Sequence, residues 1–435
     1  MLQRYLQIFL IASLVMCGAT SWAQADETQQ TAPLSLEQCI GIAMQNQLDI
    51  LVGKNNVIAA KSRSIQAKST YFPQLSIQNN AFHIGSQGVL NKVTNGTAFN
   101  VTQNLFDGGL REATASSARY GVVENNAKLS RTTQSVTYDV TKAYYEVLRA
   151  KHLADVADAN VKYTGGLRDQ IKARAELGDA AAVDVLPVES QLANAQVNLL
   201  SAKNAVRNAA LQLQNAMGVS PSQKFDVQDI GSAPEMDIQP LEIYQASASK
   251  DRPDIKETTA GLGAAKASVR SARINLYPRP VISGQYQREI AGGFTTSGTQ
   301  VVGGIVFDIF NGGANKAAYK EARALQVSAE QQQKQVYKDI EVQVEEAYLN
   351  LTSAKERLAA SEIGLAAAQK NNEAQIDRYN QGLGITLDLL NAELQLITAQ
   401  TNEVEARYDY YVAAAQLEYA VGKQGGPDAS KKETT

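Results

Sequence analysis

Apolar residues recur every three or four positions through most of the chain, which is the spacing of one face of a helix. In residues 110–176, Val136, Val140 and Tyr144 fall on one such face, and no proline interrupts the stretch. A continuous helix of this length would extend about 100 Å. Helices so long are unusual in globular domains and indicate coiled coils or helical tubes.

Two shorter stretches, residues 74–107 and 280–310, alternate apolar and polar residues instead. Alternation predicts strands, and the Gly-, Asn- and Ser-rich centre of each stretch predicts a hairpin turn. Pro73 and Pro278 end the helices expected before them, because proline cannot continue a helix. The alternating apolar positions are Phe99, Val101, Leu105, Val301, Ile305, Phe307 and Ile309.

The same order of helices and strands occurs twice. Sliding the chain along itself places Leu105–Gly109 on Ile309–Gly313 and carries the match without a gap to Gly218 on Gly422. A repeat this long predicts two copies of one folding unit rather than a solenoid. The expected parts are a first repeat at 24–218 with long helices from 110, a linker at 219–240, a second repeat at 241–422 with long helices from 314, and a flexible tail at 423–435.

The first residues predict an export signal. Arg4 precedes an apolar run, and Ser21-Trp22-Ala23 offers a cleavage site for a signal peptide of residues 1–23. A cut after Ala25 is an alternative. Cys17 leaves a lipid anchor open, although the residue before it is larger than lipidation prefers. Export would place the protein outside the cytoplasm.

Charged residues are rare in the two predicted hairpins, and aromatic residues gather there. Apolar strand faces with aromatic residues near the strand ends predict a lipid-facing band. The alternative is a small soluble sheet whose aromatic face packs on a helix. Seven of the nine Phe lie in or beside the hairpins, namely Phe72, Phe82, Phe99, Phe106, Phe294, Phe307 and Phe310.

Strands in a membrane would require an oligomer. Two hairpins provide four strands, whereas the smallest membrane barrels have about eight. An open strand edge is not tolerated in hydrocarbon, because its backbone groups would lack hydrogen-bond partners. Several subunits must therefore complete one barrel.

Composition removes other classes of function. The net charge is −3 and the sequence contains no cluster of basic residues, which argues against a nucleic-acid partner. His83, His152 and the one mature cysteine, Cys39, form no metal-ligand motif, and a single cysteine allows no internal disulfide. The sequence contains no catalytic motif, so we expect neither an enzyme nor a cofactor.

This order of motifs resembles the TolC family of outer-membrane efflux proteins over nearly the whole mature chain. Each motif alone is weak, but their order, repeated twice, is specific. The matching segments are Leu36-Glu37-Gln38, Asn46-Gln47-Leu48-Asp49-Ile50, Tyr71-Phe72-Pro73, Leu105–Gly109, Arg252-Pro253-Asp254-Ile255, Arg378–Gly382 and Leu387–Ala392.

The resemblance implies a mainly α subunit that contributes four transmembrane β-strands and long coiled-coil helices to a trimeric α/β-barrel. It implies a homotrimer in the outer membrane of a Gram-negative bacterium, with a large periplasmic tunnel. It also implies two partners, a periplasmic adaptor (membrane fusion) protein and an inner-membrane pump or ABC transporter. The implied function is export of small molecules or polypeptides, as in tripartite efflux or type I secretion.

In this family, side chains at the start of the returning helices close the tunnel at its periplasmic tip. The matching pore or gate candidates are Asp184, Tyr379, Asp388 and Asn391. Two positions depart from the family pattern. Gly384 stands where a gate arginine is expected, and Asn391 stands where an aspartate lines the aperture in relatives.

The same residues have purely structural interpretations. Gly178 and Gly382 are expected to be turn glycines at the helix ends of the tip. Asp184 and Asp388 are expected to open the returning helices as N-caps, with or without a role in the gate.

The two predicted turns are acidic. Residues 168–193 hold three basic and five acidic residues, and residues 372–397 hold one basic and four acidic residues. Carboxylates at a constriction predict a cation-selective channel, unless these charges face outward or pair locally. The remaining alternative for the whole chain is a soluble periplasmic coiled-coil adaptor or scaffold protein without a membrane barrel.

Overall fold

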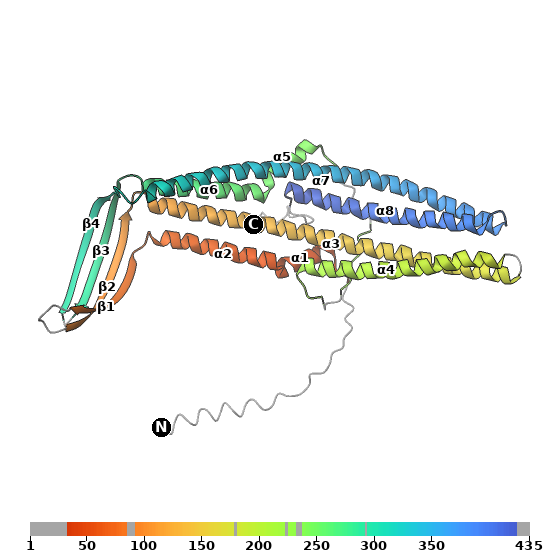
Figure 1. The fold of residues 1–435 in the computed structure, drawn as a ribbon, viewed down its shortest axis with the longest axis horizontal. Coiled ribbons are helices and arrows are strands. Elements are labelled where there is room, and N and C mark those ends of the chain that lie inside the picture. The colour runs from red at the N-terminus through yellow and green to blue at the C-terminus, as the bar shows by residue number, and fades with distance from the viewer. Residues whose placement is uncertain are drawn as a thin grey trace, which may run out of the picture.

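The structure is a computed structural model, which describes residues 33–84, 92–177, 181–221, 225–231, 237–291 and 294–423. The expected signal peptide, Cys17, Gly178 and all but the first residue of the expected tail lie outside the described residues. The chain forms a long body of helices with a sheet at one end (Figure 1). Among the described residues, no helix is both long enough and apolar enough to cross a bilayer.

The elements follow the predicted order. They are α1 (Leu36–Asn46), α2 (Leu48–Ser69), β1 (Gln74–Ile84), β2 (Lys92–Phe106), α3 (Leu110–Leu177), the 3₁₀ turn η1 (Ala182–Asp184), α4 (Val185–Met217), α5 (Leu241–Asp251), α6 (Pro253–Ile274), β3 (Arg279–Ala291), β4 (Phe294–Val306), α7 (Ala314–Asn380) and α8 (Thr386–Val421). Two antiparallel hairpins, α3 with α4 and α7 with α8, extend to the end of the body opposite the sheet, which we call the tip (Figure 1).

The duplication is visible in equivalent contacts. Gln47 joins α1 to α2, and Arg252 joins α5 to α6 in the second copy. Gly218 and Gly422 end α4 and α8 with positive φ angles of 69° and 86°. A Cβ atom on Gly218 would lie 2.9 Å from Gln47, and one on Gly422 would lie 2.9 Å from Arg252. Both copies therefore need glycine there for its φ angle and for close packing.

The main core lies halfway along the helices, where the short helices and the linker pack on α3 and α8. Tyr144 of α3 is fully buried there. Its hydroxyl lies 2.5 Å from the carbonyl oxygen of Gln228 and 3.2 Å from that of Leu34. Leu34 also forms an isolated bridge with Val227. These bonds fasten the linker and the start of α1 to the middle of the helical body.

The strands form one antiparallel sheet in the order β1-β2-β3-β4. The pairing register of β2 with β3 is regular except near the end of β2. There it shifts between Asn104 and Phe106, so that Phe106 pairs with Ile282. Leu105 is the extra residue at this shift and has no pairing partner in the register, so the regular pairing that carries the alternation of Phe99 and Val101 ends before it. Phe307 and Ile309 likewise follow β4 and are not part of it.

Candidate functional site

The strand register gives the sheet one mainly apolar face, which also carries Gln103, Arg288 and Thr299, and one mainly polar face. On one face, Leu75 pairs with Val101, which pairs with Tyr286. The polar residues of the other face also align in rows across the sheet. One such row is Gln74, Thr102, Gln285 and Gln300. A sheet that separates the two kinds of residue in this way fits lipid on one side and water on the other.

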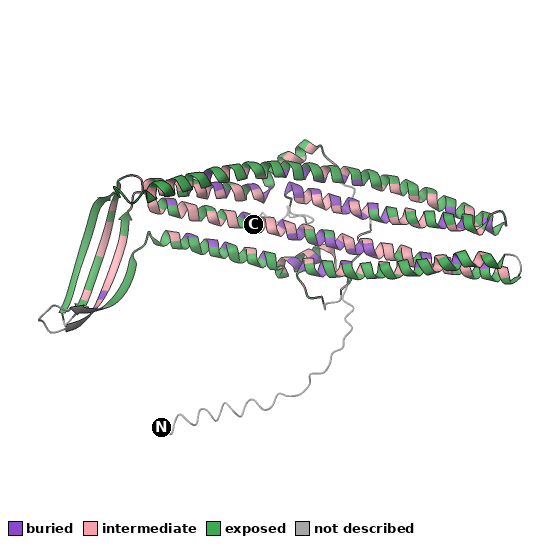
Figure 2. Cartoon of the chain, in the orientation of Figure 1, coloured by how far each residue is buried: buried purple, intermediate pink, exposed green. Residues whose placement is uncertain are grey.

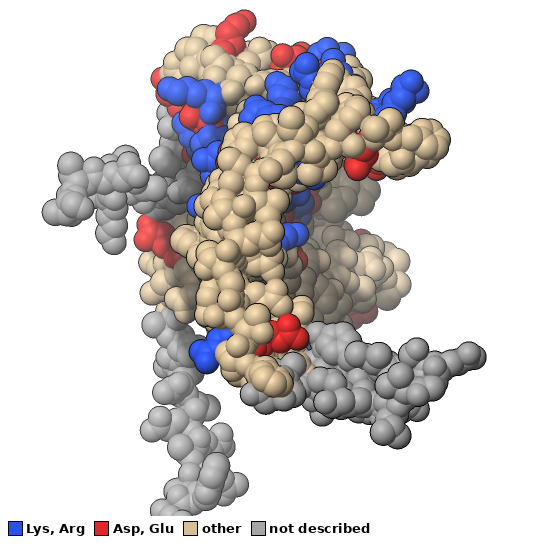
Figure 3. Space-filling model, turned by 90° about the vertical axis from the view of Figure 1, so that its left-hand side faces the viewer, with Lys and Arg blue, Asp and Glu red and all other residues tan. Residues whose placement is uncertain are grey.

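No described element of the subunit covers either face of the sheet. All residues of β4 are exposed, and the exposed fractions of Val301 and Ile305 are 70% and 74%. Among the described elements, no helix lies over the sheet (Figures 1 and 2). Figure 3 views the sheet end and shows mainly uncharged residues on it. Among the described residues the sheet does not pack on a helix, contrary to the alternative of a small soluble sheet.

At the tip, the end of α7 forms a tight glycine turn, as predicted for Gly382. Gly382 has a φ of +73°, a conformation that favours glycine. Its backbone N–H donates a hydrogen bond to the carbonyl oxygen of Tyr379 at 3.1 Å, and the Leu383 N–H donates one to the carbonyl oxygen of Arg378 at 2.8 Å. These two bonds are those of a Schellman motif, which satisfies the last carbonyl groups of the helix.

Gly384 follows in the same turn and also donates to the Arg378 carbonyl, at 3.1 Å. A Cβ atom there would lie 3.2 Å from the Tyr379 backbone nitrogen. That is a tight contact with backbone, so a larger residue would have to shift the turn. The glycine at this position therefore belongs to the compact geometry of the turn.

Neither aspartate caps its helix as predicted. Asp184 precedes α4, but its backbone has helical φ and ψ angles of −72° and −13° and its side chain makes no capping hydrogen bond. The preceding 3₁₀ turn imposes that conformation, whereas a cap residue is normally extended. Helix α8 begins at Thr386 after Ile385, so Asp388 lies within the first turn rather than before it. There its carboxylate still faces the positive end of the helix dipole.

Asp388 and Asn391 are both exposed and lie three residues apart on α8, so they share one side of that helix. Asp184 is partly exposed on the other hairpin. The subunit therefore presents Asp388 and Asn391 together and Asp184 from a separate element. In the described residues, no group of three His, Cys, Asp or Glu is arranged to hold a metal ion.

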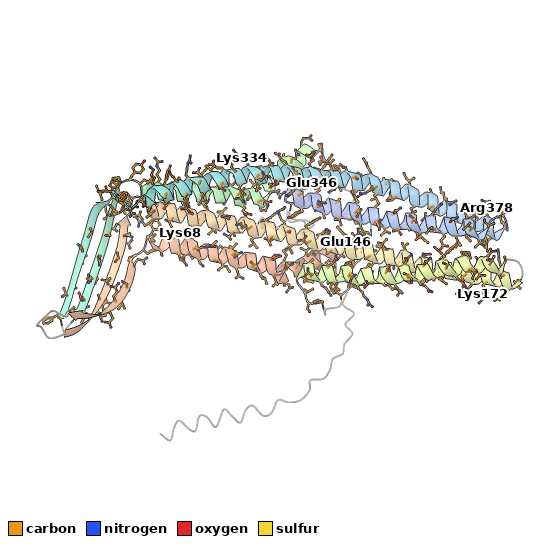
Figure 4. The ribbon with its side chains drawn as sticks, viewed as in Figure 1. Lys68, Glu146, Lys172, Lys334, Glu346 and Arg378 are labelled. Carbon is orange, nitrogen blue, oxygen red and sulfur yellow. The ribbon has the colours of Figure 1, made fainter. Side chains whose placement is uncertain are left out.

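Tyr379 has a different environment, since only 7% of it is exposed. It belongs to a small apolar cluster that joins the two hairpins near the tip, which we call the tip cluster. The Arg174 guanidinium of α3 lies 4.9 Å from the centre of its ring, within the range of a cation–π contact. Figure 4 labels Lys172 and Arg378 at the same end. The buried members of the tip cluster are Leu167, Ile171, Val188, Tyr379 and Leu389.

Glu393 was counted as one of the acidic tip charges, but it is 4% exposed. Burial raises its pKa to about 7, and the Thr164 hydroxyl opposes the rise. The acidic excess that faces solvent is therefore smaller than the sequence count. The sign of this burial in the sequence is that Glu393 lies four residues after Leu389, on the buried side of α8.

Residues 39–219 and 245–423 match the family model described as outer membrane efflux protein. Outer membrane efflux protein BepC of Brucella suis is 25% identical over 361 residues, covering 82% of this chain and 78% of that protein. Outer membrane protein TolC of Vibrio cholerae is 22% identical over 433 residues, covering 97% of this chain and 96% of that protein.

A solved structure shares the fold. The Campylobacter jejuni CmeC outer membrane channel superposes with a TM-score of 0.79 and 14% identity, covering 94% of this chain and 92% of that chain. The two regions matched by the family model coincide with the two copies of the repeat.

Proposed function

Because this chain belongs to the outer membrane efflux protein family, we propose that three copies of this outer-membrane channel subunit close one barrel from their sheets and one periplasmic tunnel from their helices. The uncovered sheet supports this assembly most directly. Its apolar face fits lipid, and its polar face fits a water-filled lumen. Strands β1 and β4 are its two edges, and pairing β4 of one copy with β1 of the next would leave no edge open.

The tip would form the narrow end of the tunnel. Asp388 and Asn391 are exposed on one side of α8, and we assign them to the pore lining with Asp184. Tyr379 is buried between hairpins, and we assign it to holding the tip together. The proposed partners are a periplasmic adaptor protein and an inner-membrane pump or ABC transporter, which would supply small molecules or polypeptides for export.

Cross-linking and mass measurement in detergent test the assembly. We expect a species of three subunits that fractionates with outer membranes and changes its electrophoretic migration on heating. A protein that stays monomeric in detergent would overturn the barrel. Recovery in the soluble periplasmic fraction would instead support the adaptor or scaffold alternative.

A further inference from the structure

A polar layer lies beside the tip cluster, between α3 of the first hairpin and α8 of the second. Glu393 of α8 faces Thr164 of α3, and Thr164 is fully buried. Asn160, one helical turn before Thr164, is 8% exposed. The carboxyl group is thus enclosed at a contact between the two hairpins of one subunit.

Among the described residues, the Thr164 hydroxyl is the one side-chain donor that the structure places within hydrogen-bonding distance of the Glu393 carboxyl group. The Thr164 hydroxyl oxygen lies 3.0 Å from Asn160 Oδ1 and 3.4 Å from Glu393 Oε1, and it carries one proton. Glu393 Oε2 is buried without a hydrogen-bond partner. A protonated Glu393 could donate to Thr164, which could then donate to Asn160, so each group in the row would have a partner. An ionised Glu393 would compete with Asn160 for one proton.

We propose that Glu393 is a positioning residue of the channel tip: as a neutral acid it holds the two hairpins of a subunit together, and its ionisation loosens them. The proton would pass to water when the contact hydrates. The tip cluster has five buried residues, far fewer than the core in the middle of the helices, so one carboxyl group matters more at the tip. This inference rests on the proposed function of the tip as the narrow end of the tunnel.

In the part of the chain that the structure describes, no cation offsets the burial of Glu393. The influences on its pKa are burial and then the Thr164 hydrogen bond, and neither involves a Lys, Arg or His among the described residues. Tyr163 of α3 is the titratable neighbour, and its pKa is raised to about 12 by burial and by Glu393, so it stays neutral.

The direction of the pH dependence follows from the raised pKa. The packed contact binds the proton more tightly than a hydrated carboxyl group, whose ordinary pKa is 4.5. The stabilisation is therefore full below pH 4.5 and is lost as the pH rises through about 7. Over that window the ratio of packed to loosened contacts should fall by up to about tenfold per pH unit in each subunit.

Conductance of the assembled channel in planar bilayers, between about pH 5 and about pH 9, tests the inference. We expect the open fraction of the wild type to rise through neutral pH, and Glu393→Gln to keep the low, acid-side value throughout. Glu405→Gln is the matched control, since Glu405 is an exposed carboxylate on the same helix. It should follow the wild type. A Glu393→Gln channel that titrates like the wild type would overturn the proposal.

Infrared spectroscopy of the purified protein separates this inference from the proposed function. At about pH 6, below the raised pKa, the wild type should show the carbonyl stretch of a protonated carboxyl group that Glu393→Gln lacks. Identical spectra would refute a neutral Glu393 whether or not the protein conducts. A protein with this band but without any conductance would retain the buried acid and contradict the channel.

Discussion

Single residues at the tip have distinct physical tasks. Gly382 supplies a backbone conformation, Tyr379 fills space between hairpins, and Asp388 remains exposed near a helix start. Each task depends on a different contribution to the free energy of the folded tip, namely backbone strain, burial of apolar surface and the electrostatics of solvent-exposed charge. Substitutions at these positions should therefore fail in different ways.

Replacing Gly382 by alanine should destabilise the turn by about 1–2 kcal/mol, because an L side chain is strained in the left-handed region. We expect faster proteolysis of the tip in the assembled protein, measured by limited digestion. Gly166→Ala is the control, because Gly166 lies within α3 with no atom close to a new Cβ. Alanine favours helix over glycine by about 1 kcal/mol, so the control should not loosen the tip. Equal digestion of both variants would contradict the turn assignment.

The role of a residue could be predicted from the sequence where that role depends only on its neighbours along the chain. Gly382 was identified because a glycine after a long helix is a common helix end. The N-cap roles of Asp184 and Asp388 were wrong because helix starts depend on the geometry of the preceding turn. The burial of Glu393 could not be deduced locally, because it arises from α3, more than two hundred residues away in the chain.

At the scale of elements, the helices and both hairpins were predicted because their periodicities are local and occur twice. The bulge near Leu105 was not predicted, since alternation in the sequence does not reveal where a strand gains a residue. The pairing of β2 with β3, which joins the two copies into one sheet, also depends on contacts distant in sequence. The two-faced character of that sheet leads to a direct test.

Replacing Val301 by arginine should destabilise the assembled barrel by about 2–4 kcal/mol if the residue lies near the middle of the bilayer. Val301 is exposed on the mainly apolar face of the single subunit. In the assembled barrel an arginine there would place its charge in contact with lipid. Gln300→Arg is the matched control, because Gln300 is the adjacent residue on the polar face. The measurement is heat-modifiable migration of outer-membrane fractions over a temperature series. Equal stability of the two variants would show that Val301 does not face lipid.

At the scale of the whole molecule, the tip should select cations. The carboxylates proposed for the pore, the partly exposed Asp184 and the exposed Asp388, would be repeated in every subunit, whereas Glu393 is buried and contributes less charge. A ring of carboxylates at a constriction attracts cations, and salt weakens this attraction. The helical body that carries the ring was predictable in outline, but its arrangement around a pore depends on contacts between subunits.

Reversal potentials under a salt gradient should show cation preference in the wild type, and the preference should decline as ionic strength rises. Asp184→Asn combined with Asp388→Asn should weaken the preference, because the exposed charge is removed. Glu405→Gln, elsewhere on α8, serves as the control. Anion preference in the wild type, or unchanged selectivity in the double variant, would remove these two residues from the pore.

The two unpaired edges of the sheet also affect the time course of biogenesis. Until another copy arrives, β1 and β4 can pair with any extended chain, which exposes the single subunit to aggregation and proteolysis. The length of this vulnerable period falls as the concentration of subunits rises, because closure requires encounters between chains. A substitution that slows assembly should therefore reduce the amount of protein recovered at low expression, even where the channels that do form transport normally.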